Sequence, residues 1–195
     1  MLHSSSTMTA QDSRSQFEAQ LLSPREHGNS GAWAFVILPK AASAKLPRRG
    51  RVTVEGRIND QYFQALAEPD GQKSHWLKID EQLLEKLGAP IGEMARFDLN
   101  AMAQEPEPQV PAELSEALKV SPEALATWQD TTTVARLDWI HWITSAKQAK
   151  TRAKRIIDAC DMLSSGKKRV CCFDSSGYYS KAFSAPRAAD PAGQG

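Results

Sequence analysis

Short runs in which hydrophobic and polar residues alternate occupy the first half of the chain, and this period of two is typical of β-strands. One run, from Trp33 to Leu38, is apolar at every position and predicts a central strand covered on both faces. The dipeptide Asn59-Asp60 separates two alternating runs, which are therefore predicted to form a hairpin. The predicted strands cover residues 17–21, 33–38, 52–58, 61–66, 75–79 and 92–99.

A short helix is predicted between the last two strands. Asp80 is placed to cap this helix, leucines follow at positions 83, 84 and 87, and Gly88 stops it. The order of strand, short helix, glycine and strand resembles the swapped-hairpin barrels of AbrB-like proteins, with Gly92-Glu93 where Gly-Asp is usual. The resemblance implies a small β-barrel of the double-split type over residues 15–101.

The second half of the chain changes to a helical period. Helices are predicted to begin at Pro111, at Ser121-Pro122 and within residues 131–133. In the helical stretch over residues 147–163, one set of residues recurs at steps of three and four and is predicted to be buried on one side of the helix: Ala149, Ala153, Ile156, Cys160 and Leu163. The other side carries Lys147, Lys150, Arg152, Lys154 and Arg155. The fold class is therefore predicted as α+β, with an N-terminal small β-barrel and a C-terminal helical subdomain.

The expected domain organisation follows these patterns. Ser-rich and Gln-rich residues without periodicity, and a Pro-interrupted acidic stretch, mark the non-globular parts. The predicted parts are a disordered tail over 1–14, the barrel over 15–101, an acidic linker over 102–110, the helical domain over 111–170 and a mostly disordered tail over 171–195.

Charge is balanced overall and uneven locally. The chain has 24 basic and 23 acidic residues, so net charge neither favours nor excludes nucleic acid. The segment 97–130 holds seven acids against one base, whereas 147–169 holds eight bases against two acids. This asymmetry predicts either an internal electrostatic match or a docking surface for an external partner.

Cysteine usage and the amino terminus indicate the compartment. The chain has three cysteines, of which Cys171 and Cys172 are adjacent, and this is a poor disulfide framework. The first residues lack the basic and apolar regions of a secretory signal, and the longest apolar run is too short to span a bilayer. We therefore expect a cytoplasmic protein with no membrane span.

Few residues are candidates for chemistry. The basic helix side is a candidate for binding an anion or a partner, and it is also typical of a solvated face. Trp139 and Trp142 lie three apart and are candidates for a pocket, although core packing is the commoner role. The scattered histidines have no partner at triad or ligand spacing. No metal-ligand, cofactor or catalytic fingerprint is recognised, so no catalytic, cofactor-binding or metal residues are predicted.

A family resemblance rests on the last helices. Trp142-Ile143, Ala146-Lys147, Thr151-Arg152 and Arg155-Ile156 follow the pattern W-I-x-x-A-K-x-x-x-T-R-x-x-R-I of the YdeI/OmpD-associated family. The resemblance covers residues 15–170. The predicted barrel in this range resembles the domain of unknown function that is commonly fused ahead of the family segment. Members are associated by name with protection against bacteriocins, and the resemblance implies no reaction, ligand or catalytic residue.

The chain departs from the family pattern at two positions. Ala149-Lys150 stands where members often have Pro-Glu, so a softer helix break is expected there. Asp60 replaces the glycine of a usual Asn-Gly turn, which makes a type I′ turn less favourable.

Three functional hypotheses remain open. The first, which we adopt, is a non-catalytic binding or stress-protection protein that binds an unknown protein or small ligand. The second is a phosphate or nucleic-acid binder that uses the basic helix side, although no motif or aromatic platform for reading bases supports it. The third is an enzyme with a pocket between barrel and helices. The oligomeric state stays open.

Overall fold

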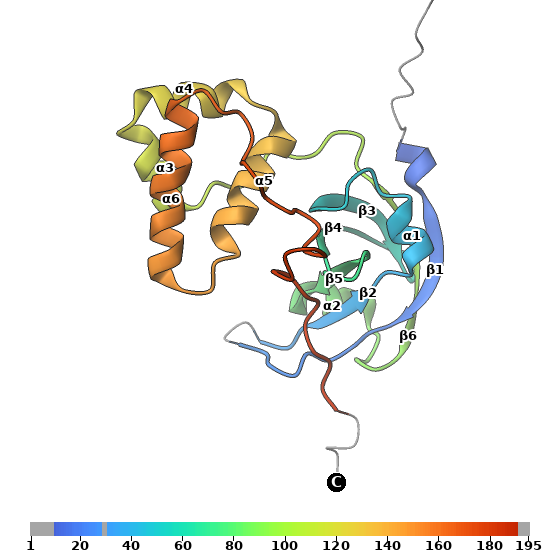
Figure 1. Ribbon diagram of the computed structural model, residues 1–195. Coiled ribbons are helices and arrows are strands. Elements are labelled where there is room, and N and C mark those ends of the chain that lie inside the picture. The colour runs from blue at the N-terminus through green and yellow to red at the C-terminus, as the bar shows by residue number, and fades with distance from the viewer. Residues whose placement is uncertain (1–9, 29–30, 191–195) are drawn as a thin grey trace, which may run out of the picture. The chain divides into compact units, whose positions relative to one another are not determined.

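The structure, a computed structural model, describes residues 10–28 and 31–190. These residues form two compact units, which are described separately (Figure 1). The barrel unit comprises residues 10–104 and 176–190, and the helical unit comprises residues 105–175. Residues 1–9 and 191–195, where part of the expected terminal disorder falls, lie outside the described residues.

The strands of the barrel unit are β1 (Ser15–Gln20), β2 (Ala34–Ile37), β3 (Val52–Ile58), β4 (Gln61–Pro69), β5 (His75–Ile79) and β6 (Met94–Ala101). They pair antiparallel in one curled sheet of order β1-β6-β3-β4-β5-β2. Just past β1, Leu22 exchanges two backbone hydrogen bonds of 2.9 Å with Phe35 of β2, so the two outer strands meet. The α+β class with a barrel-like sheet is confirmed. The AbrB-like subtype is not confirmed.

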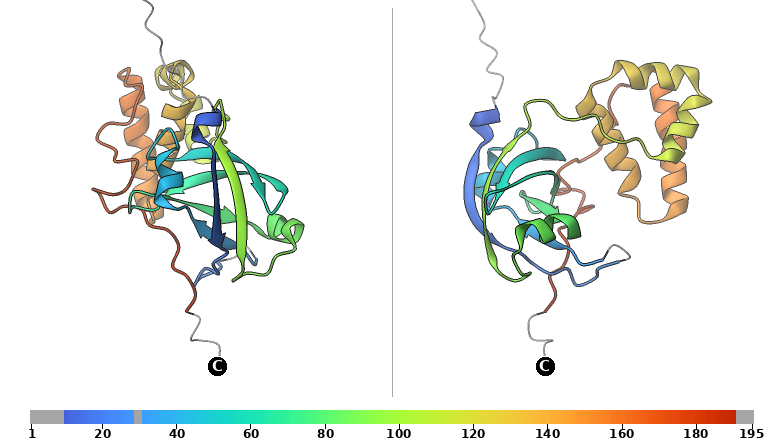
Figure 2. Two further views of the ribbon diagram at one scale, coloured as in Figure 1. Left: turned by 90° about the vertical axis from the view of Figure 1, so that its right-hand side faces the viewer. Right: turned by 180° about the vertical axis from the view of Figure 1, so that it is seen from behind.

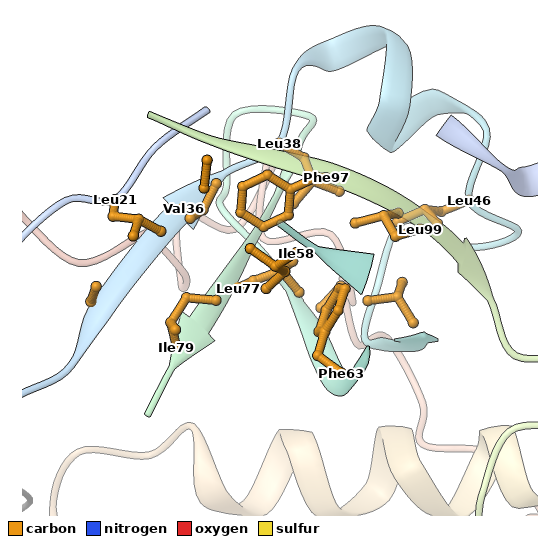
Figure 3. Packing of buried hydrophobic residues seen from close by; sticks show 14 of the residues in the cluster. Leu21, Val36, Leu38, Leu46, Ile58, Phe63, Leu77, Ile79, Phe97 and Leu99 are labelled. Atoms are coloured by element: carbon orange, nitrogen blue, oxygen red, sulfur yellow. The ribbon is translucent and has the colours of Figure 1, made fainter. Parts of the chain in front are cut away.

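The core of the barrel unit lies inside the curl of the sheet. Figure 3 shows Ile58, Leu77 and Phe97 pointing toward one another from three different strands. All three are buried, as the alternating sequence pattern requires for residues on one face of a strand. Burial of such side chains contributes roughly 1.5–3 kcal/mol each.

The hairpin turn between β3 and β4 forms despite the missing glycine. Both Asn59 and Asp60 have positive φ, 46° and 69°, as a two-residue type I′ turn requires. Asn59 is held from β6, because its backbone N–H donates to the Arg96 carbonyl at 2.9 Å and its Oδ1 accepts from the Arg96 N–H at 2.8 Å. These bonds offset the strain that a non-glycine residue has in this conformation.

Three short helical segments accompany the strands. The helix α2 (Glu81–Leu87) begins and ends as predicted: the Asp80 side chain accepts from the Leu83 N–H, and Gly88 is left-handed with φ 61°. The helix α1 (Lys40–Ala44) and the 3-10 helix η1 (Ala10–Ser13) were not predicted. Both are too short to show a helical period.

The helical unit is built from α3 (Ala112–Lys119), α4 (Pro122–Asp130), α5 (Thr133–Thr144) and α6 (Ala149–Ser164). The Thr132 side chain caps α5 by accepting from the Ala135 N–H, within the predicted start region. Helix α6 contacts the other three helices (Figure 2). Their buried side chains form a second hydrophobic core, separate from that of the sheet.

The buried side of α6 differs in part from the predicted one. Ile156 and Leu163 are buried as expected, and Ala159 joins them. Ala149 and Ala153 are exposed, so their predicted burial was wrong. They lie in the first turns of α6, next to residues 145–148, where the helix is fully broken. A break there lets the chain reverse between α5 and α6, which moves the start of α6 out of the core.

The end of the described chain lies along the barrel unit. The Arg25 N–H donates to the Arg187 carbonyl at 2.7 Å. Phe183 packs against Gly71, where an added Cβ would lie 2.1 Å from the Phe183 carbonyl oxygen, so only glycine fits this close approach. Within the described residues, no helix has both the length and the apolar composition needed to cross a membrane.

Candidate functional site

The residues of the family-like pattern meet at the corner between α5 and α6. The Arg155 Nη1 donates to the Trp142 carbonyl at 2.5 Å and to the Ser145 hydroxyl at 3.2 Å. Its guanidinium also lies over the Trp142 ring, 5.4 Å from the centroid. Carbonyls in the last turn of a helix lack intrahelical partners and carry partial negative charge, so a cation stabilises them. Arg155 thus ties α6 to the end of α5.

Arg152 acts on the residues just beyond the same helix end. Its Nη1 donates to the carbonyls of Ala146 and Lys147, at 3.1 Å and 3.3 Å. Two of the five predicted anion-binding residues are therefore bound to backbone carbonyls within the helical unit. A linear pattern of basic residues does not distinguish such arginines from charges that face solvent.

The three lysines of the basic helix side have a different environment. Lys147, Lys150 and Lys154 are exposed, and Lys154 pairs with Asp158 one turn further along α6, at 3.3 Å. An isolated surface pair of this kind contributes roughly 0.3–0.5 kcal/mol. Binding of an anion or partner by the predicted set of five residues stays a prediction.

The two candidate pocket tryptophans form an edge-to-face pair. Their ring centroids are 6.2 Å apart with planes at 73°, a favourable aromatic geometry. Trp139 is fully buried and donates its Nε1–H to the Lys168 carbonyl at 3.2 Å. Trp142 is half-buried beneath Arg155. Both rings pack in the helical unit, and a pocket role for them stays a prediction.

The acidic and basic segments are partly matched with each other inside the helical unit. Asp130 from the acidic segment pairs with Lys168 from the basic segment at 2.7 Å, which lowers the pKa of Asp130. Glu107 instead pairs with Arg136 of α5, and hydrogen bonds from that guanidinium lower the pKa of Glu107. Arg136 also donates to the Thr131 carbonyl at 2.6 Å. The charge asymmetry therefore has an internal role.

A buried polar network lies in the barrel unit between α1 and β5. His75 and Ser43 are both fully buried, and the Ser43 Oγ lies 2.7 Å from the His75 Nδ1. The His75 Nε2 lies 2.8 Å from the Gly50 carbonyl, which can only accept, so Nε2 carries the proton. Nδ1 is then the acceptor for the Ser43 hydroxyl. Burial lowers the pKa of His75, so the ring stays neutral.

This network predicts that acid destabilises the barrel unit. The folded protein keeps His75 neutral, while the unfolded chain takes up a proton near pH 6.5. The stabilisation is therefore complete above about pH 6.5 and falls as the pH drops through that value toward the lowered pKa of the folded state. Urea unfolding between about pH 8 and about pH 5 measures this loss. His75→Gln should flatten the profile, while exposed His27→Gln should leave it unchanged; an equal slope in all three proteins would contradict the assignment to His75.

An open hollow of about 400 Å³ adjoins this network. Basic and aromatic residues dominate its wall, and no carboxylate is among the described residues that line it: Ala44, Arg49, Lys73, Ser74, Ser176, Tyr178 and Tyr179. Arg49 is held in place because its guanidinium donates to the carbonyls of Ser43 at 2.6 Å and Leu46 at 2.9 Å. Burial lowers the pKa of Arg49, and arginine nevertheless keeps its charge at neutral pH.

Lys73 is positioned by the loop between β4 and β5, which internal hydrogen bonds hold in place. The buried Asp70 carboxylate accepts from the N–H groups of Gln72 at 2.7 Å and Ser74 at 2.9 Å. Lys73 between them has a positive φ of 70°, an uncommon conformation for a residue with a side chain. Its ammonium lies 4.5 Å from the centroid of the Tyr178 ring. Two cations and an aromatic ring are thus held around one hollow.

A second hollow, of about 380 Å³, lies along β1 and β6, and three of its charged residues form ion pairs. Arg14 binds the Asp98 carboxylate at 2.6 Å and 2.8 Å, and hydrogen bonds from Arg14 and Gln16 lower the pKa of Asp98 to about 2. Arg96 in the same wall pairs with Asp60 at 3.5 Å. Groups already paired in this way have less charge left for a ligand, so the first hollow is the stronger candidate site.

Sequence reasoning did not identify Arg49 and Lys73. They are 24 positions apart in a chain rich in basic residues, and no linear motif links them. The Asp70-Gly71 turn was the one available signal for this site. The aromatic wall comes from Tyr178 and Tyr179, in a stretch without periodicity.

Two family models match the sequence, one in each half of the chain. Residues 107–166 match the family model described as Bacteriocin-protection, YdeI or OmpD-Associated. Residues 17–99 match the model described as Domain of unknown function (DUF1905). No curated protein matches the sequence significantly. The resemblance carried by the Trp142 to Ile156 pattern is confirmed. Residues 107–166 thus carry a segment of the YdeI/OmpD-associated family, and this domain of unknown function precedes it in the chain.

Proposed function

We propose that this protein is a non-catalytic binding protein that holds a small anionic ligand with a flat ring in the hollow beside Arg49 and Lys73. Such binding fits the protective role named in the family description, and we place the protein in the cytoplasm, because its three cysteines form no structural disulfide. The observation that carries the proposal is the pairing of two positioned cations with an aromatic wall and no lining carboxylate among the described residues.

The charges favour an anion. Arg49 and Lys73 give the lining a formal charge of +2. Hydrogen bonds between ionised groups are roughly twice as strong as neutral ones. Because the Arg49 guanidinium and the loop that carries Lys73 are already fixed by hydrogen bonds, little ordering is needed on binding.

The buried network supports binding without turnover. The Ser43 and His75 side chains contact each other, and both are fully buried. His75 uses both ring nitrogens within the protein. A substrate atom in the hollow therefore has no path to the hydroxyl, so the pair serves the fold rather than nucleophilic catalysis.

Aryl phosphates test the proposal directly. Phenyl phosphate should bind the full chain by calorimetry more tightly than inorganic phosphate, because its ring packs on tyrosine. Lys73→Gln should lower this affinity about tenfold, the effect of losing one charge-assisted hydrogen bond. Lys150→Gln, an exposed lysine on α6, is the matched control and should leave affinity unchanged.

The same experiment separates binding from catalysis. p-Nitrophenyl phosphate should bind without releasing nitrophenol. Equal affinity for phenyl phosphate and inorganic phosphate, or equal loss in the Lys73 and Lys150 variants, would contradict the hollow as the site. Nitrophenol release that disappears in Ser43→Ala would overturn the non-catalytic assignment.

A further inference from the structure

We infer that Cys171 and Cys172 form a reversible redox site, in which a low-molecular-weight disulfide oxidises the two thiols to a disulfide between adjacent residues. The inference rests on the geometry of this pair in the helical unit and does not depend on the proposed ligand site. All three cysteines are free thiols, and Cys171 and Cys172 are exposed while Cys160 is half-buried.

The two sulfurs are already in contact. The Cys171 and Cys172 Sγ atoms are 3.1 Å apart. In an extended backbone, adjacent side chains point to opposite faces, so this contact needs an unusual conformation. Cys172 supplies it with a positive φ of 60°. Uncommon left-handed residues that lack glycine's freedom cluster at functional sites, and here the conformation places both thiols on one side of the chain.

The turn is held from both sides. Ahead of it, the Lys168 carbonyl accepts from the Thr131 hydroxyl at 2.7 Å and from the Trp139 indole at 3.2 Å. Behind it, the Phe173 ring packs edge-on against the buried His141, with centroids 5.4 Å apart. The residues between these anchors are presented to solvent on a fixed frame. The sulfur contact is therefore part of the folded helical unit.

The reaction balances with one disulfide as oxidant. The Cys171 thiolate attacks one sulfur of glutathione disulfide, forms a mixed disulfide and releases glutathione as its thiolate. The Cys172 thiol then loses its proton and attacks the Cys171 sulfur, which forms the internal disulfide and releases the second glutathione. The protein loses two protons and two electrons, and the oxidant becomes two glutathione molecules. Hydrogen bonding to Cys171 raises the pKa of Cys172, so the Cys172 thiol is protonated during the first step.

The neighbouring charges favour this oxidant. Glutathione disulfide is an anion, and Lys167 and Arg169 lie a few residues before the pair, with Val170 between Arg169 and Cys171. Opposite charge raises the encounter rate in a manner that salt screens. The Cα atoms of adjacent residues are about 3.8 Å apart, below the roughly 4.4–6.8 Å usual for a disulfide, so the oxidised form is strained and easily reduced. Both properties suit a switch rather than a permanent cross-link.

Mass spectrometry of the full chain tests the inference. After treatment with glutathione disulfide, the wild-type protein should lose the mass of two hydrogen atoms and regain it with dithiothreitol. Cys172→Ser should instead accumulate one glutathione adduct, because the second step is removed. Cys160→Ser should behave as wild type, because burial raises the pKa of the Cys160 thiol and the residue lies outside the pair.

Salt and cross-linking give independent readouts. The oxidation rate should fall several-fold between low and high salt, and a Lys167→Gln/Arg169→Gln variant should lose most of this dependence. Wild-type protein that accumulates the same glutathione adduct as Cys172→Ser, or that forms disulfide-linked dimers in place of the internal bond, would overturn the inference.

Discussion

Replacing Arg155 by alanine is expected to lower the free energy of unfolding of the helical unit by about 2 to 3 kcal/mol, the range for a charge-assisted hydrogen bond with an added cation–π contact. The side chain binds the Trp142 carbonyl and the Ser145 hydroxyl and covers the Trp142 ring. Its loss leaves the last turn of α5 without this partner. Hydrogen exchange of α5 and α6 amides, compared with that of the barrel strands, measures the effect for this unit alone.

Two further variants separate the hydrogen bonds from the charge. Arg155→Lys keeps the charge but loses the planar fork, so we expect it to recover less than half of the loss. Lys150→Ala removes an exposed charge from the same helix and should change stability by no more than about 0.5 kcal/mol. Equal losses in Arg155→Ala and Lys150→Ala would show that the corner contributes nothing specific.

Gly56→Ala is expected to destabilise the barrel unit by about 3 kcal/mol or more, at the upper end for overpacking. Gly56 pairs with Leu99 between β3 and β6 and has a φ of 154°. A Cβ there would lie 1.9 Å from the Asp98 carbonyl oxygen and 2.8 Å from the Leu99 Cα. Backbone atoms cannot rotate away as a flexible side chain can, so the two strands must separate. Urea unfolding followed by hydrogen exchange of the β3 and β6 amides measures the loss.

Gly88 offers the matched control for this substitution. It also has a positive φ, of 61°, but an added Cβ would meet nothing within 4 Å. Gly88→Ala should therefore show only the backbone strain of a left-handed residue, about 1 to 2 kcal/mol. If the two variants were equally unstable, the clash with β6 would have no measurable effect and the prediction for Gly56 would be wrong.

The corner geometry gives the family pattern a physical meaning. Trp142 and Ala146 supply the carbonyls, and Arg155 and Arg152 supply the donors that bind them. The ring of Trp142 also packs under Arg155. These positions of the pattern therefore describe how two helices are joined, and they need no ligand to explain them. A binding site is better sought among Arg49, Lys73 and Tyr178 of the barrel unit.

Local patterns determined the elements of this protein. The alternation of residues 52–58, the Asn59-Asp60 turn, the Asp80 cap and the Gly88 stop each act through neighbours in the sequence, and each appears in the structure where it was predicted. The family pattern around Trp142 and Arg155 was also readable, because its spacing lies within one helical hairpin. Ala149 and Ala153 show the limit of this reasoning, since helical period predicts which side they share and not whether the core reaches them.

Only the tertiary structure decided what the charged residues do. Arg152 and Lys150 look alike in a linear pattern, yet one binds the Ala146 carbonyl and the other is exposed, because the chain reverses at 145–148. The hollow at Arg49, Lys73 and Tyr178 needs three segments that are brought together by the curl of the sheet and the return of residues 176–190. The sequence by itself determined the strands, the helices and the family resemblance, because those depend on residues a few positions apart. The partners of each charged residue depend on contacts across the fold, and no spacing along the chain encodes them.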